Sequence, residues 1–170
     1  TTDMETAETL YFDHYDNKEN LLKIVRASSS LPVLSGSVIF QGRELVDGGV
    51  SNPIPIHPLL ERGLHKNVVI LTRNKGYIKK ASRLNWLFNR LYGDKPALLH
   101  ALRTRHMIYN QTMNELREME RRGEVFIIQP ELPLLSSRIE RNNQKLRDLY
   151  RQGYEEASDK KEALVRFMQS

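Results

Sequence analysis

The stretch Leu-Val-Asp-Gly-Gly-Val-Ser-Asn-Pro-Ile-Pro at residues 45–55 carries the strongest signal for both the fold and the chemistry. Asp47 follows an apolar segment and directly precedes Gly48 and Gly49. Two successive glycines permit positive φ and a close backbone approach, so a turn here presents the carboxylate at the end of a strand. Ligands of open α/β sheets gather near the carboxyl ends of strands, which makes Asp47 a candidate site residue. The alternative is an ordinary Asp-Gly turn.

Strand and helix patterns alternate on both sides of this stretch. The expected strands are 9–12, 37–41, 44–46, 68–71 and 125–128, with Gly42 supplying a tight hairpin turn. The expected helices are 16–28, 56–62, 77–91, 97–122 and 137–150, and a last one opened by Ser158. The runs 68–71 and 125–128 are uniformly apolar, which favours strands buried on both faces. The sequence therefore predicts the α/β class with a mixed or parallel sheet.

Length and composition are those of a globular domain with a modest positive charge. The 170 residues include 26 Lys and Arg against 21 Asp and Glu, a net charge of +5, and no Cys. This length favours one domain, and the absence of Cys excludes disulfides and thiolate chemistry. No signal peptide or membrane-length apolar run is present, so we expect a cytoplasmic protein, with peripheral membrane contact. Because the sequence opens on Thr1 without Met, we expect a piece of a longer protein.

The positions of the glycines and histidines exclude several well-known sites. No two of the nine glycines have the spacing of a dinucleotide fingerprint, a P-loop or a G-x-S-x-G nucleophile elbow. No two of the five histidines stand four residues apart, as an H-E-x-x-H metal helix requires. We therefore expect neither a metal nor a cofactor.

Several other polar residues have structural explanations. The serines 28–30 lie at a helix end without a glycine elbow, which favours capping or packing over a nucleophilic role. His57 is close enough to Asp47 in sequence to line the same cleft, and the alternative is a surface or capping position. His100 and His106 lie on the polar side of the long helix, whereas Arg105 falls on its apolar face. We assign these last three no chemistry and interpret Arg105 as structural.

A basic face with one tryptophan is expected on the helix 77–91. Lys79, Arg83 and Arg90 cluster there around Trp86. This pattern is typical of an interfacial helix that binds a lipid surface. The alternative is a solvated face on which a single aromatic side chain packs against a neighbour.

These motifs together resemble the patatin-like phospholipase family, in its bacterial branch. The resemblance rests on Ala-Ser-Ser-x-x-Pro at 27–32, Asp-Gly-Gly at 47–49 and Asn-Pro-x-Pro at 52–55, and it is strongest over residues 19–73. Gln-Pro at 129–130 and the segment 145–154 are also similar to that branch. The resemblance implies a three-layer α/β/α sandwich. Residues 1–170 would be the C-terminal part of a single such domain, with about 130–170 as a helical extension.

The family resemblance also implies a mechanism, namely a Ser–Asp dyad that hydrolyses lipid or other acyl esters. Asp47 would be the general base, and Gly48 and Gly49 would shape its loop. The nucleophile elbow and the Gly-rich oxyanion loop are absent from the sequence, so we expect the chain alone to be inactive. We expect a missing N-terminal half or a second copy to complete the fold.

The alternative function is a non-catalytic basic module that binds a membrane surface or nucleic acid. Acidic residues interrupt the basic ones, notably in 115–124. We therefore expect no nucleic-acid partner.

Overall fold

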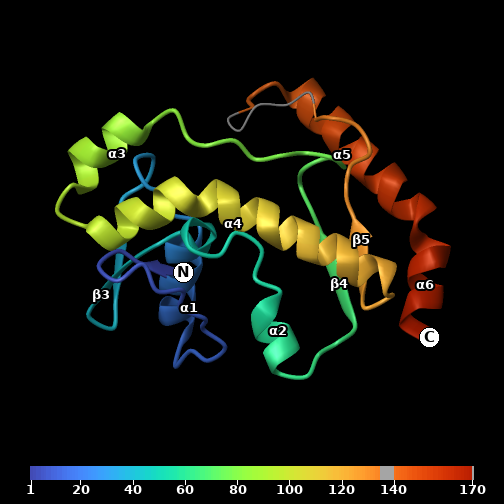
Figure 1. The fold of residues 1–170 in the computed structure, drawn as a ribbon, viewed down its shortest axis with the longest axis horizontal. Helices are drawn as coiled ribbons and strands as arrows, with labels where there is room; N and C mark the ends of the chain where they lie inside the picture. Colours follow the sequence, from blue (N-terminus) through green and yellow to red (C-terminus); the bar gives the residue numbers. More distant parts are fainter. Residues whose placement is uncertain (135–139, 170) are drawn as a thin grey trace. The chain divides into compact units, whose positions relative to one another are not determined.

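The computed structural model describes residues 1–134 and 140–169, which form two compact units (Figure 1). The first unit comprises Thr1–Pro55 and Lys79–Thr112, and the second comprises Ile56–Ile78 and Met113–Ser170. The long helix α4, Pro96–Arg121, therefore contributes its first part to one unit and its last part to the other. Helices, an antiparallel sheet and a parallel strand pair together are compatible with the predicted α/β class.

The first unit is built on a three-stranded antiparallel sheet. Its strands are β1 (Thr2–Asp3), β2 (Val38–Phe40) and β3 (Arg43–Val46), in the order β1-β3-β2. The hairpin β2–β3 turns through Gln41 and Gly42, whose φ angles are +49° and +76°. Two positive φ angles in a two-residue loop are typical of the type I′ turn, which matches the twist of a hairpin. The hairpin predicted around Gly42 is thus confirmed.

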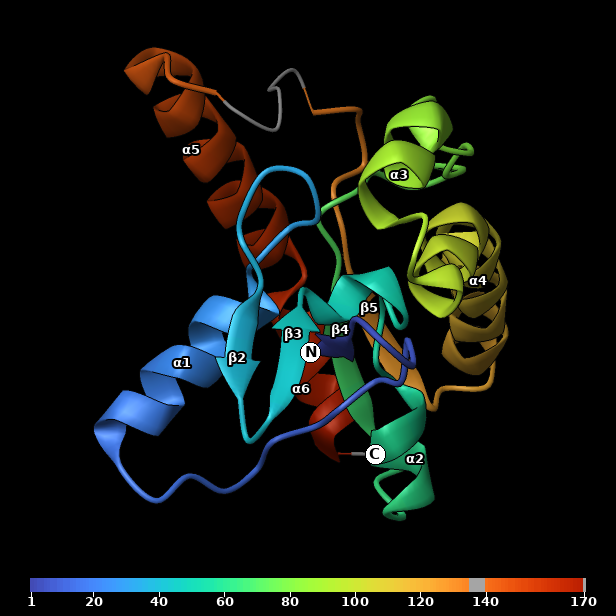
Figure 2. The same ribbon diagram turned by 90° about the vertical axis from the view of Figure 1, so that its left-hand side faces the viewer.

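Strand β3 lies between two hydrophobic clusters. Successive residues of a strand point to opposite faces, so the fully buried Leu45 and Val46 face different clusters. Leu45 packs with Ala27 of α1 (Lys18–Ser28), Val38 and Phe40, and Figure 2 shows α1 alongside the hairpin. Val46 packs in a second cluster with residues of α3 (Asn85–Tyr92), α4 and the 3-10 helix η1 (Gly48–Val50); its other buried members are Met4, Val50, Phe88, Leu98, Ala101 and Leu102. This packing fixes the strand end that leads into Asp47.

The second unit contains a parallel strand pair. Strand β4 (Asn67–Ile70) pairs in parallel with β5 (Val125–Ile128), in agreement with the expected parallel sheet. Three helices belong to the same unit: α2 (His57–Glu61), α5 (Asn143–Asp159) and α6 (Lys161–Gln169). Phe167 of α6 packs against Phe126 of β5, with ring centroids 5.7 Å apart.

The expectation that both strands of this pair are buried on both faces is wrong for β4. Val68 and Ile70 are 39% and 73% exposed, whereas Asn67, on the opposite face, is buried. A run of apolar residues indicates that both faces of a strand can be buried. It does not show that the same chain provides the helices or strands that bury them.

Two further predictions are corrected, namely the strand over 9–12 and the first part of the helix over 77–91. Residues 9–12 form no strand; Thr9 makes a single bridge to Thr2, which belongs to β1. Residues 77–84 are not helical, and α3 begins only at Asn85. Lys79 explains part of this difference, because its backbone N–H and C=O bond to the side-chain amide of Asn110 instead of to a helical turn.

Helix starts differ from the expected capping residues. Helix α1 is capped by Asn17, whose side chain accepts the N–H of Asn20, rather than by Asp16. Helix α5 begins at Asn143 with Asn142 as its cap, and the expected start at Ser137 lies outside the described residues. Ser158 lies inside α5, where its hydroxyl donates to the Tyr154 carbonyl. The last helix, α6, begins at Lys161 instead. Among the described residues, none of the helices is both long enough and apolar enough to cross a bilayer.

Candidate active site

Asp47 occupies the turn at which the chain leaves β3 and enters η1. Its backbone N–H donates to the Ser30 carbonyl at 2.9 Å, which ties the turn to the end of α1. Its side chain caps η1, because Oδ1 accepts the N–H of Gly49 at 2.7 Å. Oδ2 accepts no hydrogen bond from any residue that the structure describes, and the residue is half-buried. The carboxylate is thus oriented by one oxygen, and the residues that the structure describes donate no hydrogen bond to the other.

Gly48 and Gly49 allow neighbouring atoms to lie close to the turn; they do not supply unusual backbone angles. Neither has a positive φ, so of the two properties that glycine permits here the turn uses only the close approach. A Cβ on Gly48 would lie 3.0 Å from the main-chain nitrogen of Thr1. A Cβ on Gly49 would lie 3.0 Å from Nη2 of Arg105 and 3.1 Å from Oδ1 of Asp47. Glycine at 49 therefore leaves room for a guanidinium and a carboxylate on the same side of the turn.

Three hydroxyl side chains lie next to this turn. The sequence does not mark them as candidates. Thr2 is fully buried, and its Oγ1 lies 3.0 Å from the Asp47 carbonyl oxygen and 2.8 Å from Oγ of Ser51. Thr9 extends the group, with its Oγ1 2.7 Å from Ser51 Oγ. Single Ser and Thr residues are too common in sequences to mark such a group, so only the fold reveals it.

The serines at the end of α1 have the structural role expected for them. The hydroxyls of Ser29 and Ser30 donate to the last carbonyls of α1, at 2.9 Å to Val25 and 2.8 Å to Arg26. Ser28 is the exposed last residue of that helix. Hydroxyls engaged in this way favour the capping interpretation over a nucleophilic one.

His57 and Asp47, ten residues apart in sequence, belong to different compact units. His57 is exposed at the start of α2, in the second unit, where its Nε2 lies 3.1 Å from Oε2 of Glu115. His100 is exposed on α4, and Nδ1 of His106 contacts the Arg103 carbonyl one turn earlier. In the described parts of the chain, no group of three or more His, Asp and Glu side chains is arranged to hold a metal ion.

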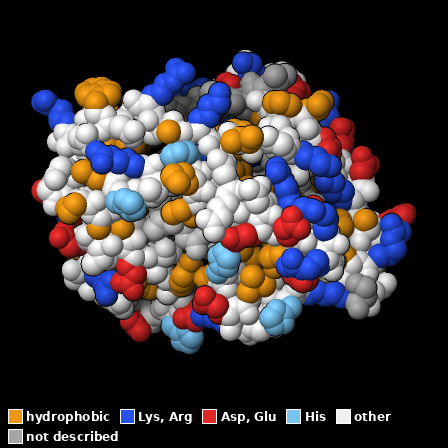
Figure 3. Space-filling view, viewed as in Figure 1, with side chains coloured by type: hydrophobic (Ala, Val, Ile, Leu, Met, Phe, Trp, Pro, Cys, Tyr) orange, Lys and Arg blue, Asp and Glu red, His pale blue; other side chains and the backbone are white. Residues whose placement is uncertain are grey.

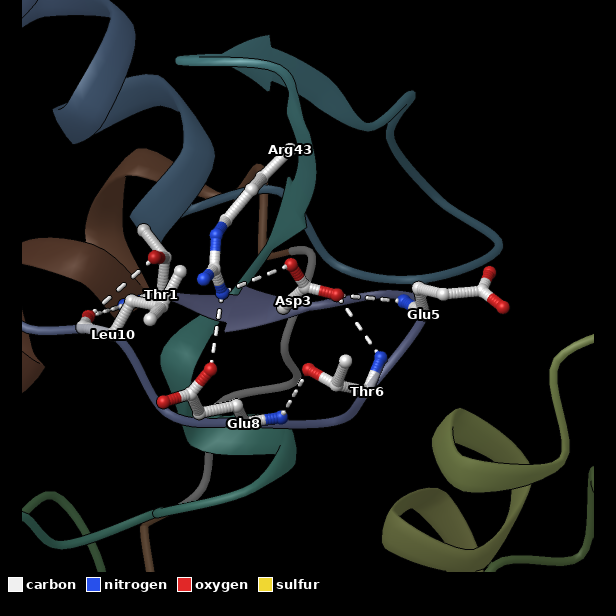
Figure 4. A network of polar contacts seen from close by, with 7 residues as sticks. All are labelled: Thr1, Asp3, Glu5, Thr6, Glu8, Leu10 and Arg43. Carbon is white, nitrogen blue, oxygen red and sulfur yellow. Dashed lines mark hydrogen bonds and ion pairs between the residues drawn. The ribbon is translucent and has the colours of Figure 1, made fainter.

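A charged network holds β1 against β3 next to the candidate site (Figure 4). Arg43 extends from β3 to Asp3 at 3.4 Å and to Glu8 at 3.0 Å. Burial on its own raises the pKa of Asp3. The backbone N–H groups of Thr6 and Glu5, together with Arg43, outweigh that effect, so the pKa lies below its usual value. Asp3 therefore stays ionised and keeps the first strand in place.

The predicted basic face around Trp86 is only partly formed. Trp86 is 65% exposed on α3, and Arg83 and Arg90 are also exposed. Lys79 lies outside this helix, with its ammonium 4.9 Å from the centre of the Tyr109 ring. Arg83 also precedes this helix, so α3 itself carries only Trp86 and Arg90 of the predicted face.

Comparison with known proteins gives two family matches at different ends of the chain. Residues 1–60 match the model of the patatin-like phospholipase family. These residues contain the whole Asp47 turn and the three hydroxyls behind it. Residues 95–169 match a second family, described as a domain of unknown function (DUF6363).

One curated relative supports the first match. Over 60 residues the chain is 35% identical to human (Homo sapiens) patatin-like phospholipase domain-containing protein 4, an alignment that covers 34% of this chain. The alignment covers 24% of the relative, so the chain spans about a quarter of that protein's length. Both findings support the patatin-like relationship that the motifs at 27–32, 47–49 and 52–55 indicate.

Proposed function

We propose that this chain supplies the general base of a patatin-like serine acyl hydrolase acting on lipid or other ester substrates, with Asp47 as that base. One observation carries the proposal: within the residues similar to this hydrolase family, Asp47 has one carboxylate oxygen fixed by Gly49, and the described part of the chain donates no hydrogen bond to the other. A carboxylate held in this way is suited to accept the proton of a serine hydroxyl while that serine attacks the ester carbonyl.

The remaining parts of the site come from outside these 170 residues. The sequence holds no G-x-S-x-G elbow, and an acyl-transfer site needs a nucleophile, a base and oxyanion donors together. We infer that the chain is the C-terminal half of a three-layer α/β/α domain of the bacterial branch, with about 130–170 as a helical extension. In this arrangement the N-terminal half supplies the serine, and that half or a second copy covers the exposed face of β4.

The first experiment is an esterase assay on the isolated chain with a short p-nitrophenyl ester. We expect no hydrolysis above background, because only the base is present. Turnover that a serine-directed phosphonate abolishes would contradict this part of the proposal, and would return the serines 28–30 to consideration as nucleophiles.

The second experiment replaces Asp47 by Asn in the complete protein that joins this chain to its serine. The substitution keeps the size of the side chain and removes the proton acceptor, so we expect kcat to fall by about 10²–10⁴-fold. The melting temperature should change little. Asp94→Asn, at an exposed position, is the matched control and should keep kcat. A near-normal kcat for Asp47→Asn would remove this residue from the mechanism.

A second candidate function rests on exposed side chains of α3 and on Arg83, which precedes this helix. We infer that Trp86, Arg83 and Arg90 contact an anionic membrane surface, since an exposed tryptophan flanked by cations is typical of interfacial helices. Because Trp86 is the single tryptophan of the chain, a blue shift of its emission on adding anionic vesicles would report this contact directly. Unchanged emission would reject it. Figure 3 shows basic and acidic side chains interspersed over the face drawn, a mixture that does not favour a nucleic-acid partner.

A further inference from the structure

A line of three hydroxyl groups ends at the backbone carbonyl of Asp47. Oγ1 of Thr9 lies 2.7 Å from Oγ of Ser51, which lies 2.8 Å from Oγ1 of Thr2, which lies 3.0 Å from the Asp47 carbonyl oxygen. Thr2 has no exposed surface, and Thr9 and Ser51 are half-buried. All four residues belong to the first compact unit.

One assignment of the hydroxyl protons uses every contact in this line. The Asp47 carbonyl can only accept, so the proton of Thr2 points to it. Thr2 then accepts from the Ser51 hydroxyl and, at 3.3 Å, from the Ser51 backbone N–H. Ser51 in turn accepts from Thr9. All three hydroxyls thus donate in the same direction along this line, from Thr9 toward Asp47. Hydrogen bonds arranged in this way polarise and strengthen one another.

This line fixes the Asp47 turn through its backbone carbonyl and not through its carboxylate. Thr2 stands across from Val46 in the pairing of β1 with β3, so a strand and not a loop sets its position. The Asp47 carbonyl also accepts the N–H of Val50 at 3.1 Å, and the Asp47 N–H donates to Ser30. Among the described residues, the backbone of Asp47 therefore has three hydrogen bonds, while its carboxylate has one, to Gly49. The direction of the carboxylate follows from the backbone that Thr2 helps to hold.

We propose that Thr2 is a positioning residue, which orients Asp47 for proton transfer through its hydroxyl bond to the Asp47 carbonyl. The inference rests on the proposed function of Asp47. A base must lie within hydrogen-bond reach of the proton that it removes, and a displacement of about 1 Å is enough to cost roughly 10²-fold in rate. A residue that never touches substrate thus controls the rate of the chemical step.

The test compares Thr2→Val with Thr2→Ser in the complete protein. Valine keeps the shape of threonine and loses the hydroxyl, so kcat should fall by about 10- to 100-fold with KM unchanged. Serine keeps the hydroxyl and should restore most of kcat. Thr104→Val is the matched control, because the Thr104 hydroxyl donates within α4, to the His100 carbonyl at 2.9 Å; it should keep the parent kcat.

A second measurement separates positioning from general stability. Hydrogen exchange of the Gly49 amide can be followed in the 170-residue chain itself, without any activity. In Thr2→Val the Gly49 amide should exchange about 3- to 10-fold faster than in the parent, with little change at amides of α1. A uniform increase throughout the chain would instead indicate a purely structural role and would overturn the inference.

The outcomes distinguish this inference from the function on which it rests. If Asp47→Asn abolishes activity but Thr2→Val keeps the parent kcat, the positioning role is wrong and the function of Asp47 stands. If Asp47→Asn keeps its activity, both are wrong. Should Thr2→Val not fold, Ser51→Ala removes the next hydroxyl in the line while leaving Thr2 in place. We expect a smaller fall in kcat for that variant, and no fall would overturn the inference.

Discussion

Gly49→Ala is the most direct perturbation of the Asp47 turn. The added methyl group would lie 3.0 Å from Nη2 of Arg105 and 3.1 Å from Oδ1 of Asp47. The guanidinium is the end of a flexible side chain and can move away. The carboxylate cannot move without stretching its bond to the Gly49 N–H, which is 2.7 Å long. The crowding therefore acts on the one hydrogen bond that orients the candidate base.

The expected change in the free energy of unfolding of Gly49→Ala follows from two opposing effects. Losing a hydrogen bond to a charged group lowers the free energy of unfolding by about 1.5–3 kcal/mol. Replacing glycine by alanine at a position with ordinary φ raises it by about 0.4–1 kcal/mol, because the unfolded chain loses freedom. Gly36→Ala isolates this second effect, since Gly36 has no positive φ and no neighbour within 4 Å of its Cβ position. The two variants should differ by about 1.5–3 kcal/mol, with Gly49→Ala the less stable.

Urea unfolding of the 170-residue chain measures this difference. With a slope of about 2 kcal/mol per molar urea, the midpoint of Gly49→Ala should fall roughly 1 M below that of Gly36→Ala. Both variants should keep the slope of the parent. Equal midpoints, or a higher midpoint for Gly49→Ala, would show that the turn accommodates a methyl group, and would refute the argument that glycine is needed there for space.

Two further predictions concern the support of this turn. The pKa of Asp3 is lower in the folded state than in the unfolded chain, so its contribution to stability is complete above the unfolded pKa and is lost as the pH falls through the folded pKa. Acid titration of unfolding should therefore show a shallower decline for Asp3→Asn than for the parent, and parallel curves would contradict this. Leu98 is fully buried in the cluster that contains Val46 and Val50, so Leu98→Ala should lower the free energy of unfolding by about 2–5 kcal/mol in urea titrations. A loss below about 1 kcal/mol would show that α4 does not support the turn.

The sequence predicted those helices, strands and turns that are determined by residues close to one another in the sequence. The hairpin around Gly42, the long helix ending before Gly123 and the parallel strands near 68 and 125 all follow from turn residues and apolar periodicity. The helix expected over 77–91 failed in its first half because Asn110, remote in sequence, binds the backbone of Lys79. Tertiary hydrogen bonds of this kind override local helix propensity.

The candidate site was predictable only at its centre. Asp47 and the two glycines stand out because Asp-Gly-Gly is an unusual combination at the end of an apolar strand. Thr2 does not stand out, and Arg105 stands out only as a charged residue on an apolar helix face; what each contacts depends on positions that only the fold defines. Thr2 reaches Asp47 through strand pairing, whereas Arg105 comes near Gly49 because α4, which begins at Pro96, packs in the same unit.

The two family matches meet in one hydrophobic cluster. Val46 and Val50, which flank Asp47, come from the region similar to patatin-like phospholipases, whereas Leu98 and Leu102 come from the region of unknown function. The side chains of all four are packed together, and Arg105, one turn further along α4, reaches Gly49. The boundary between the compact units falls later, after Thr112. The first turns of α4 are thus part of the structure that holds the Asp47 turn, and cutting the chain between the two family matches would remove one wall of the candidate site.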